Sequence, residues 1–277
     1  MNIVIVNMSC KEEIKMYYFP FQPEINSNTL NYTEYKPSRN QHSNIALFYQ
    51  FRTKKETETH LSLVPDGCFD FLFCCDPNKR NVFLWTSPLF RKEHPELLND
   101  CIYFGVRFYP EQTVIQLNNH LHELIGQLIP LFEVLTYRIP ILEQIAECNS
   151  FQQRISTFEK FILSIQQSNN SYKDITDYAI QKIYDSKGTI SIKELSRDIG
   201  YTEQYIRRKF TENVGFSPKQ FSKIVQFQFV IDEFLLCSNT STQDIIYDNG
   251  FYDQAHFIKV FKQMTNFTPK QYQQFFK

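Results

Sequence analysis

The sequence has few glycines and prolines, no cysteine pair of the CxxC type and no long apolar run. With 7 Gly and 12 Pro among 277 residues, a fibrous or low-complexity chain is excluded. The seven cysteines, an odd number without metal-site spacing, disfavour a disulfide framework and a zinc module and suit a reducing cytoplasm. No stretch reaches the ~18 apolar residues of a membrane span, and the N-terminus lacks the basic region of a secretory signal. We therefore expect a cytoplasmic protein without membrane contact.

Common catalytic sequence patterns are also missing. The chain has no P-loop, no Rossmann glycine pattern and no GxSxG nucleophile elbow. We therefore expect neither an enzyme nor a cofactor. A rival interpretation is a DNA-repair or thiol-reactive enzyme, which requires a reactive cysteine beside a histidine or arginine in the first half of the chain.

What the sequence does have is apolar material for two cores, since 42% of its residues are hydrophobic and 16% aromatic. Its net charge is -1, but the charge is uneven. Residues 171–277 carry 14 basic and 12 acidic side chains, a net of +2, whereas the remainder carries 15 and 18, a net of -3. This asymmetry gives mild support for a nucleic-acid partner of the C-terminal part.

The first ~110 residues have the pattern of short strands separated by turns. In the segment 68–74, Phe69, Phe71 and Phe73 alternate with Asp70 and its neighbours, so the two sets face opposite sides of a sheet. The expected strands are Ile45–Arg52, His60–Val64, Cys68–Cys74, Asn81–Thr86 and Cys101–Phe108. Their spacing predicts a β-rich domain, barrel or sandwich-like.

From about 111 to 168 the apolar residues follow a helical period, most clearly over 151–165. Such a helix packs on its own domain or forms half of a dimer seam. The polar stretch Gln166–Lys173 then marks a boundary. We expect a domain at 1–168, a linker at 169–173 and an all-α domain at 174–277. The fold class is α+β: a β-rich N-terminal domain with helices, and a C-terminal domain of two helix–turn–helix units joined by a long linker helix.

The C-terminal domain contains an internal repeat. The segment 195–221 reads LSRDIGYTEQYIRRKFTENVGFSPKQF, and the segment 245–272, IIYDNGFYDQAHFIKVFKQMTNFTPKQY, repeats this pattern about fifty residues later. Gly200 aligns with Gly250 at an offset of 50 and Phe210 with Phe261 at an offset of 51, so one residue is gained just after the glycine. Each copy predicts a helix–turn–helix, in which the glycine makes the bend.

Helix caps divide this domain into seven helices. Ser191 with Glu194 forms a capping-box pattern, Thr202 caps the next helix, and Gly215 ends that helix. Ser217-Pro218 opens a fourth helix that reaches about Leu236. The remaining helices begin near Ser241, at Asp253 and at Thr268-Pro269, and Asn266 replaces Gly at the second C-terminal cap.

The outward positions of the second helix in each unit are suited to reading DNA. Arginine grips guanine O6 and N7 with two hydrogen bonds, and glutamine pairs with adenine. The candidate base-reading residues are Gln204, Arg207, Arg208, Gln254, His256 and Lys259. Ser191 and Thr202, at helix N-termini with outward backbone N–H groups, are candidate phosphate contacts.

The separation of the two units also fits DNA. A helix from Pro218 to about Leu236 is ~28 Å long at ~1.5 Å per residue, close to the ~34 Å between successive major grooves on one face. The alternative is a compact helical bundle whose charged face is merely solvated.

This C-terminal region, about Asp174 to Phe276, closely resembles the AraC/XylS transcription regulators, most specifically over GFYDQAHFIKVFKQMTNFTPKQY at 250–272. The resemblance implies a bacterial protein that controls promoters through two recognition helices, more often an activator, with RNA polymerase as a partner. It places base contacts on the six residues named above and makes Lys262 a phosphate neighbour. Gln226 and Phe229 stand where the resemblance leads us to expect arginine, which predicts weaker nonspecific DNA affinity.

The N-terminal stretches LVPDGCFDFLF (63–73) and YFGVRFYP (103–110) are similar to an uncharacterised domain that heads one AraC-family subgroup. Asp66 with Gly67 indicates a turn or a ligand contact. Asp70 lies among aromatic residues, so it needs a partner if it faces inward, and Arg107 is the candidate. An Asp70–Arg107 pair is either structural or part of a pocket, so Asp66, Asp70 and Arg107 are candidate effector-binding residues.

Two further groups have an inert and a reactive interpretation. Cys74 and Cys75, with Cys68 and Cys101, are buried hydrophobes or thiol and metal sensors. His120 and His122 are exposed helix histidines or metal ligands, and no third ligand stands at a diagnostic spacing, so we expect no metal site.

We therefore expect a sequence-specific DNA-binding transcription regulator. Its N-terminal domain would bind a small-molecule effector, form a homodimer, or both, and change how the reading helices are presented. A ligand-independent regulator controlled by its abundance is the further alternative.

Overall fold

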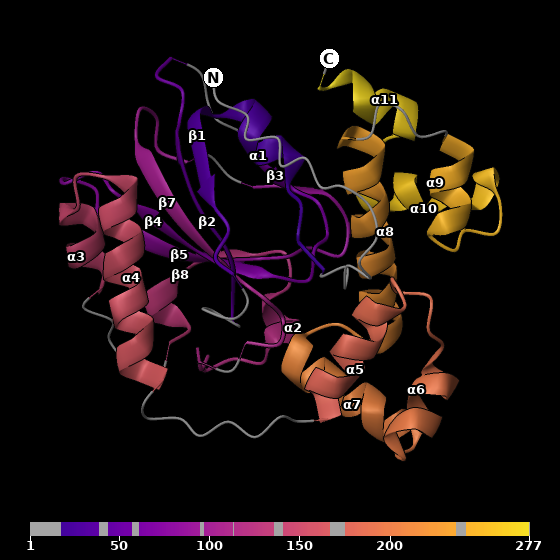
Figure 1. The fold of residues 1–277 in the computed structure, drawn as a ribbon. Helices are drawn as coiled ribbons and strands as arrows, with labels where there is room; N and C mark the ends of the chain where they lie inside the picture. The colour runs from indigo at the N-terminus through magenta and orange to yellow at the C-terminus, as the bar shows by residue number, and fades with distance from the viewer. Residues whose placement is uncertain are drawn as a thin grey trace.

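The computed structural model describes residues 18–38, 44–56, 61–94, 97–112, 114–135, 141–166, 175–236 and 242–276. The predicted α+β class is confirmed. Figure 1 shows an N-terminal sheet with helices on one side and a helical C-terminal region on the other, in which the long helix α8 lies nearer to the sheet than α9 and α10. The predicted linker at 169–173 lies outside the described residues, so the domain boundaries remain a prediction.

The main sheet has six antiparallel strands in the order β1-β2-β7-β4-β5-β8, and β3 pairs with β6 in a second, small sheet. Strand β7 is central, with Asp70 of β4 directly opposite Arg107 of β7. The bounds are β1 (Leu30–Tyr35), β2 (Ile45–Arg52), β3 (Ser62–Leu63), β4 (Phe69–Cys74), β5 (Asn81–Thr86), β6 (Lys92–Glu93), β7 (Ile102–Phe108) and β8 (Leu128–Pro130). The five predicted strands are thus present, with β3 shorter than expected.

Helices α3 (Ile141–Glu147) and α4 (Phe151–Gln166) cover one face of the sheet (Figure 1). The Phe158 ring of α4 lies 6.4 Å from Phe71 and 5.9 Å from Phe73, centroid to centroid. The predicted alternation in β4 is therefore confirmed, because its phenylalanines face this helical layer. The apolar stripe predicted over 151–165 packs on the sheet of its own domain.

The opposite face of the sheet belongs to a core that it shares with the C-terminal region. Leu72 and Cys74 of β4 share one apolar core with α5 (Ile175–Asp185) and α8 (Pro218–Leu236). Helix α1 (Pro23–Asn28) borders this core. The two halves of the chain are thus joined by buried apolar side chains.

Seven helices occupy the described part of 175–276, as predicted. Capping-box hydrogen bonds open α6 at Ser191 and α11 at Thr268. The remaining bounds are α6 (Ile192–Ile199), α7 (Glu203–Val214), α9 (Thr242–Asp248), α10 (Gln254–Thr265) and α11 (Pro269–Gln274). Helix α8 has the predicted bounds, because Pro218 at its start and the apolar period behind it are local signals.

The region 111–168 departs from the uniformly helical prediction. It contains a short helix, α2 (Leu121–Leu124), and then β8, which pairs with the edge of β5. A three-residue edge strand is too short to show a two-residue period, and an edge position tolerates Pro130. No helix in the described part of the chain combines the length and the apolar character needed to cross a bilayer.

Candidate DNA-binding interface

The first helix–turn–helix consists of α6 and α7. Gly200 between them has φ +78°, a left-handed conformation that suits glycine. Ser191 Oγ accepts a hydrogen bond from Glu194 N at 3.2 Å, and Thr202 Oγ1 accepts one from Tyr205 N at 3.3 Å. These caps satisfy N–H groups at the first turns of both helices, so the local sequence alone stabilises the bend.

The second unit consists of α9 and α10. Gly250 has φ +73°, and Asp253 caps α10 by accepting a hydrogen bond from His256 N at 2.7 Å. The N-cap of α10 lies three residues after Gly250, whereas that of α7 lies two residues after Gly200. This difference is the extra residue that the sequence repeat predicts.

The inward faces of the second helices of the two units, α7 and α10, are buried. Ile206 and Phe210 of α7 are 1% exposed, and Phe257 and Phe261 of α10 are 2% and 1% exposed. The Phe261 ring lies 5.6 Å from Phe227 of α8. Each recognition helix is therefore fixed to the linker helix by its own apolar stripe.

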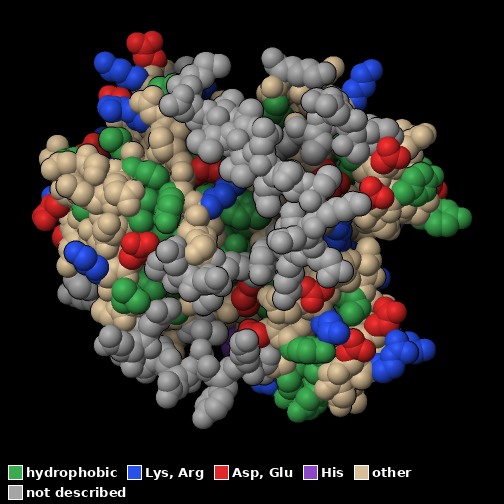
Figure 2. Space-filling model, viewed as in Figure 1, with side chains coloured by type: hydrophobic (Ala, Val, Ile, Leu, Met, Phe, Trp, Pro, Cys, Tyr) green, Lys and Arg blue, Asp and Glu red, His purple; other side chains and the backbone are tan. Residues whose placement is uncertain are grey.

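The predicted DNA contacts all face solvent. The exposed side chains are Ser191, Thr202, Gln204, Arg207 and Arg208 in the first unit and Gln254, His256, Lys259 and Lys262 in the second. The first unit also carries acidic groups beside its arginines, since Arg207 is 3.4 Å from Glu203 and Arg208 is 3.4 Å from Glu212. In Figure 2, basic and acidic side chains are interspersed over the lower right, where α5, α6 and α7 lie.

The two recognition helices do not present the same chemistry. At the offset of 51, Arg208 corresponds to Lys259, which is also exposed, but Arg207 corresponds to Ile258, which packs against the core of the second unit. Within the described residues, Lys259 and Lys262 have no ion-pair partner, unlike the arginines of α7. At these two exposed positions α7 carries two cations, whereas α10 carries one, Lys259, which has no ion-pair partner in the described part of the chain.

Helix α8 separates the two units. In Figure 1, α6 and α7 lie at one end of α8, and α9 and α10 lie towards the other end. Helices α6 and α9 are on the side away from the sheet. Its 19 residues correspond to ~28 Å at ~1.5 Å per residue. This length is close to one helical turn of B-DNA, ~34 Å.

Gln226 and Phe229, where the family resemblance leads us to expect arginine, have structural contacts. Gln226 Nε2 donates to Asn249 O at 2.8 Å and so ties α8 to the turn of the second unit. The Phe229 ring lies edge-on to Tyr18 of the N-terminal domain at 6.1 Å. Both side chains therefore serve the packing of the domains around α8.

The candidate effector residues form a closed, buried network. Arg107 donates two hydrogen bonds to Asp70, at 2.8 and 2.7 Å, and its third nitrogen lies 3.6 Å from Asp66. Tyr49 donates to Asp70 at 2.5 Å and Gln22 donates to Asp66 at 2.8 Å. Asp66, Asp70 and Arg107 are at most 2% exposed. The predicted Asp70–Arg107 pair is present, and every charge in it has a protein partner.

Burial and pairing act against each other in this network. Burial raises the pKa of Asp70, and Arg107 only partly offsets this effect. Burial disfavours the charge of Arg107, but Asp70 and Asp66 outweigh it and hold the pKa of Arg107 above its usual value. Because the ion pair replaces water for both groups, breaking it by removing one partner is costly.

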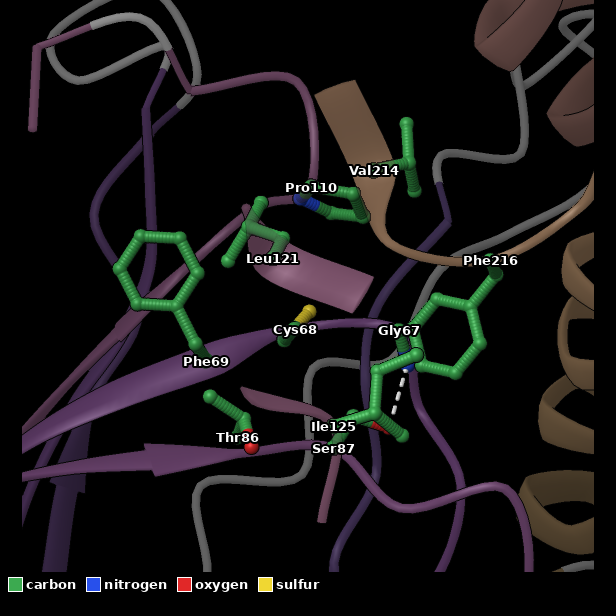
Figure 3. Close-up of a pocket in the computed structure, with 10 residues that line it drawn as sticks. All are labelled: Gly67, Cys68, Phe69, Thr86, Ser87, Pro110, Leu121, Ile125, Val214 and Phe216. Carbon is green, nitrogen blue, oxygen red and sulfur yellow. Dashed lines mark hydrogen bonds between the residues drawn. The ribbon is translucent and has the colours of Figure 1, made fainter. Parts of the chain in front are cut away.

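Asp66 and Gly67 form the predicted turn. Asp66 Oδ1 accepts a hydrogen bond from Cys68 N at 2.9 Å, and Gly67 N donates to Ser87 Oγ at 2.9 Å. Figure 3 shows Gly67 and Ser87 beside a small cavity that Val214 and Phe216 close from the C-terminal side. Its free volume is about 10 Å³, room for about one water molecule.

Cys68, Cys74, Cys75 and Cys101 are buried. Burial raises the pKa of Cys75 and of Cys101 to about 11, which disfavours a reactive thiolate. His120 and His122 are exposed at α2, as predicted, with ring centroids 5.6 Å apart.

Three residues at or near the candidate interface are absent from the predicted site residues: Tyr201, Tyr252 and Arg91. Tyr201 and Tyr252 directly precede the N-caps of the two recognition helices and are 47% and 86% exposed. Apolar side chains stand out at the right-hand edge of Figure 2, over α9 and α10. The equal placement of the two tyrosines before the caps was the available signal. Arg91, which contacts the second unit, has no such pattern around it in the sequence.

Comparison with known proteins agrees with this geometry. Residues 195–274 match the family model described as a helix-turn-helix domain. Two uncharacterised HTH-type transcriptional regulators of Staphylococcus aureus, from strains N315 and MRSA252, are 35% and 34% identical over 83 residues. Each match covers 30% of this chain and 11% of the relative, so the chain spans only a small part of their length.

Two solved structures are similar at low identity. The C-terminal domain of AraT from Geobacillus stearothermophilus is 18% identical, with a TM-score of 0.35, covering 38% of this chain and 88% of that one. ToxT from Vibrio cholerae is 14% identical, with a TM-score of 0.45, covering 88% and 98%. The family match covers the part of the chain that contains both capped units and α8. Residues 195–274 therefore form a helix–turn–helix domain, in agreement with the resemblance of this region to the AraC/XylS regulators.

Proposed function

We propose that this protein is a sequence-specific DNA-binding transcription regulator that reads two adjacent major grooves. The observation that carries the proposal is the pair of exposed polar helix faces, on α7 and α10, at opposite ends of the 19-residue α8. A single exposed helix face is also common in solvated bundles, but two copies at this separation match the repeat of B-DNA.

In this proposal the two recognition helices, called the first head (α7) and the second head (α10), contact different groups on the bases. Arg207 and Arg208 donate to guanine O6 and N7, after leaving their ion pairs with Glu203 and Glu212. Such exposed pairs contribute only ~0.3–0.5 kcal/mol, whereas one good base contact discriminates by ~1–3 kcal/mol. The exchange of partners therefore favours the base.

The second head contributes Gln254, His256 and Lys259 to bases, and Lys262 to a phosphate. Ser191 and Thr202 place the N-termini of α6 and α7 near the phosphate backbone of the DNA. Because Ile258 replaces a cation here, we expect the second block of the site to be less dependent on guanine than the first. The whole site is asymmetric.

The N-terminal domain modulates this reading, and activation through RNA polymerase is the direction we propose. Contacts through α8 connect the sheet to both heads, and an effector or a second copy of the chain would act on these contacts. Asp66, Asp70 and Arg107 already pair with one another. We therefore propose that these residues stabilise the surface of the N-terminal domain that contacts α8. Bound effector would have to displace that network.

The test is selection of bound sequences from random duplex DNA by the full-length protein at near-physiological salt. Two enriched blocks about one helical turn apart support the proposal. A single block shows that one head dominates and refutes two-groove reading, and binding without sequence preference refutes a sequence reader.

A further inference from the structure

We infer that Arg91, in the N-terminal domain, is a positioning residue for the second recognition helix and thereby sets the spacing of the DNA site. The inference rests on the proposed two-groove function. Arg91 lies just before β6, far from the reading face of α10, so it would act through the placement of that helix.

Arg91 is the centre of a contact network between the two halves of the chain. Its side chain donates to both carboxylate oxygens of Glu24, at 2.8 to 3.1 Å, and to Ser62 Oγ at 2.8 Å. Glu24 in turn accepts a hydrogen bond from Tyr272 of α11 at 2.9 Å. Glu24 is 6% exposed and Tyr272 is 0% exposed, so this network is shielded from water.

The backbone of Arg91 holds the C-terminal end of α10 directly. Arg91 N donates to Met264 O at 2.7 Å, and Asn266 Nδ2 donates to Arg91 O at 3.2 Å. The guanidinium also lies over the Phe267 ring, 5.3 Å from its centroid. A carbonyl at a helix end needs a partner, and for α10 the N-terminal domain supplies one. The second head is therefore fixed to the N-terminal domain as well as to α8.

The reading positions of α10 remain free in this arrangement. Gln254, His256 and Lys259 are exposed in the N-terminal half of the helix, and Arg91 contacts the opposite end. The network therefore does not block DNA. It holds the helix at one orientation relative to the first head, which reduces the ordering cost of binding both blocks at once.

The experiment measures binding to two duplexes with the same selected blocks, one at the selected spacing and one with a single base pair inserted between them. One base pair rotates the second block by about 34°, so a rigid reader discriminates between the duplexes. The quantity of interest is the ratio of the two dissociation constants. A third duplex carrying only the first block reports on the first head.

Three variants loosen the network. Arg91→Ala removes its side-chain contacts, and Tyr272→Phe removes one hydroxyl while keeping the ring. Asn266→Gly removes the amide contact and retains the left-handed cap, since Asn266 has φ +67°. The matched control is Arg52→Ala, which removes an exposed arginine paired with Asp100 on the same domain. The two conservative variants keep the test decisive if Arg91→Ala folds poorly.

We expect the spacing ratio to fall about fivefold or more in Arg91→Ala, in line with typical coupling between sites, and to fall less in the milder variants. Binding to the first block alone stays unchanged, as does the ratio in Arg52→Ala. Wild-type ratios in all three variants would overturn the inference. If the wild type itself shows no two-block site, the proposed function fails, and this outcome is distinct because it appears without any substitution.

Discussion

Gly215 and Asn266 occupy the same position in the two helix–turn–helix units, and both touch the N-terminal domain. Both residues are left-handed caps, with φ +86° and +67°. A Cβ on Gly215 would lie 3.0 Å from the carbonyl carbon of Leu121 in α2, whereas Asn266 donates to the backbone of Arg91. The N-terminal domain therefore meets both recognition helices at their C-terminal ends, and their reading ends project away from these contacts.

The close approach of the Gly67 turn to α8 predicts that Gly67→Ala destabilises the protein. Gly67 has φ +70°, and a Cβ there would lie 2.6 Å from Cε2 of Phe221. The left-handed conformation alone costs an alanine ~1–2 kcal/mol, and displacement of the buried ring adds ~1–3 kcal/mol. Urea unfolding of the full-length protein measures the sum.

Gly200→Ala is the matched control for this prediction. Its φ is +78°, but nothing lies within 4 Å of the added Cβ. The difference between the two variants isolates the contact with Phe221. Equal losses of stability would show that the Phe221 ring accommodates the added methyl group without cost.

His94 predicts a loss of stability in mild acid. It is 5% exposed, and its Nε2 is buried without a hydrogen-bond partner in the described part of the chain. Burial, with a smaller contribution from Lys92, lowers the pKa of His94 from 6.5 to about 4. The unfolded chain therefore binds a proton between these pH values while the folded chain does not, and stability falls as the pH drops through this window.

This effect amounts to about 3 kcal/mol between pH 7 and pH 4, at ~1.4 kcal/mol for each pKa unit. Unfolding free energies of the wild type and of His94→Phe at several pH values measure it. The variant keeps a ring beside Trp85, which lies 5.2 Å from His94, but has no proton to bind. Identical pH profiles would assign the acid sensitivity to other groups.

The exposed faces of α7 and α10 carry different cations, which predicts different effects when a cation is removed from each. Arg208→Ala relaxes base preference in the first block by ~1–3 kcal/mol, and Lys259→Ala does so in the second block. Lys209→Ala is the control, because it removes a cation of α7 outside the reading set and lowers affinity uniformly. Competition binding with point-substituted duplexes checks the prediction. Wild-type binding by Gln254→Ala and Lys259→Ala would refute the two-groove reading.

The buried Asp70–Arg107 pair predicts a large cost for Asp70→Asn. Loss of one charge leaves Arg107 buried with only the more distant Asp66, and such changes cost ~3–5 kcal/mol. Asp100→Asn breaks the exposed pair with Arg52 and should cost at most ~1 kcal/mol. Urea unfolding of the two variants compares them. A small loss in Asp70→Asn would instead leave this site available to a ligand.

The sequence predicted the parts of the interface that depend on local chemistry. The caps at Ser191, Thr202 and Thr268 and the bounds of α8 follow from residues within four positions of one another. The exposed faces of α7 and α10 follow from the helical period. These features need no knowledge of the rest of the chain.

The contacts between the domains could not be predicted in this way. Tyr272 and Glu24 are 248 positions apart, and Phe21 and Gln228 are 207 apart. Such pairs are brought together by the packing of the whole chain, and no periodic pattern records them. The sequence likewise does not reveal that Phe229 lies against Tyr18 of the N-terminal domain; the weaker nonspecific DNA affinity expected from Gln226 and Phe229 stays a prediction.

Helix α8 has a consequence for how this chain can be divided. Phe221 and Val225 of this helix are buried in the core that α8 shares with Leu72 and Cys74 of β4, and Phe221 lies against the Gly67 turn of the N-terminal half. A fragment cut after the sheet would expose this apolar surface to water, the usual cause of aggregation in isolated pieces. The C-terminal half is therefore not an independent module, because it depends on the N-terminal half to cover α8. Joined to a different N-terminal domain, this half would need a new apolar partner for α8.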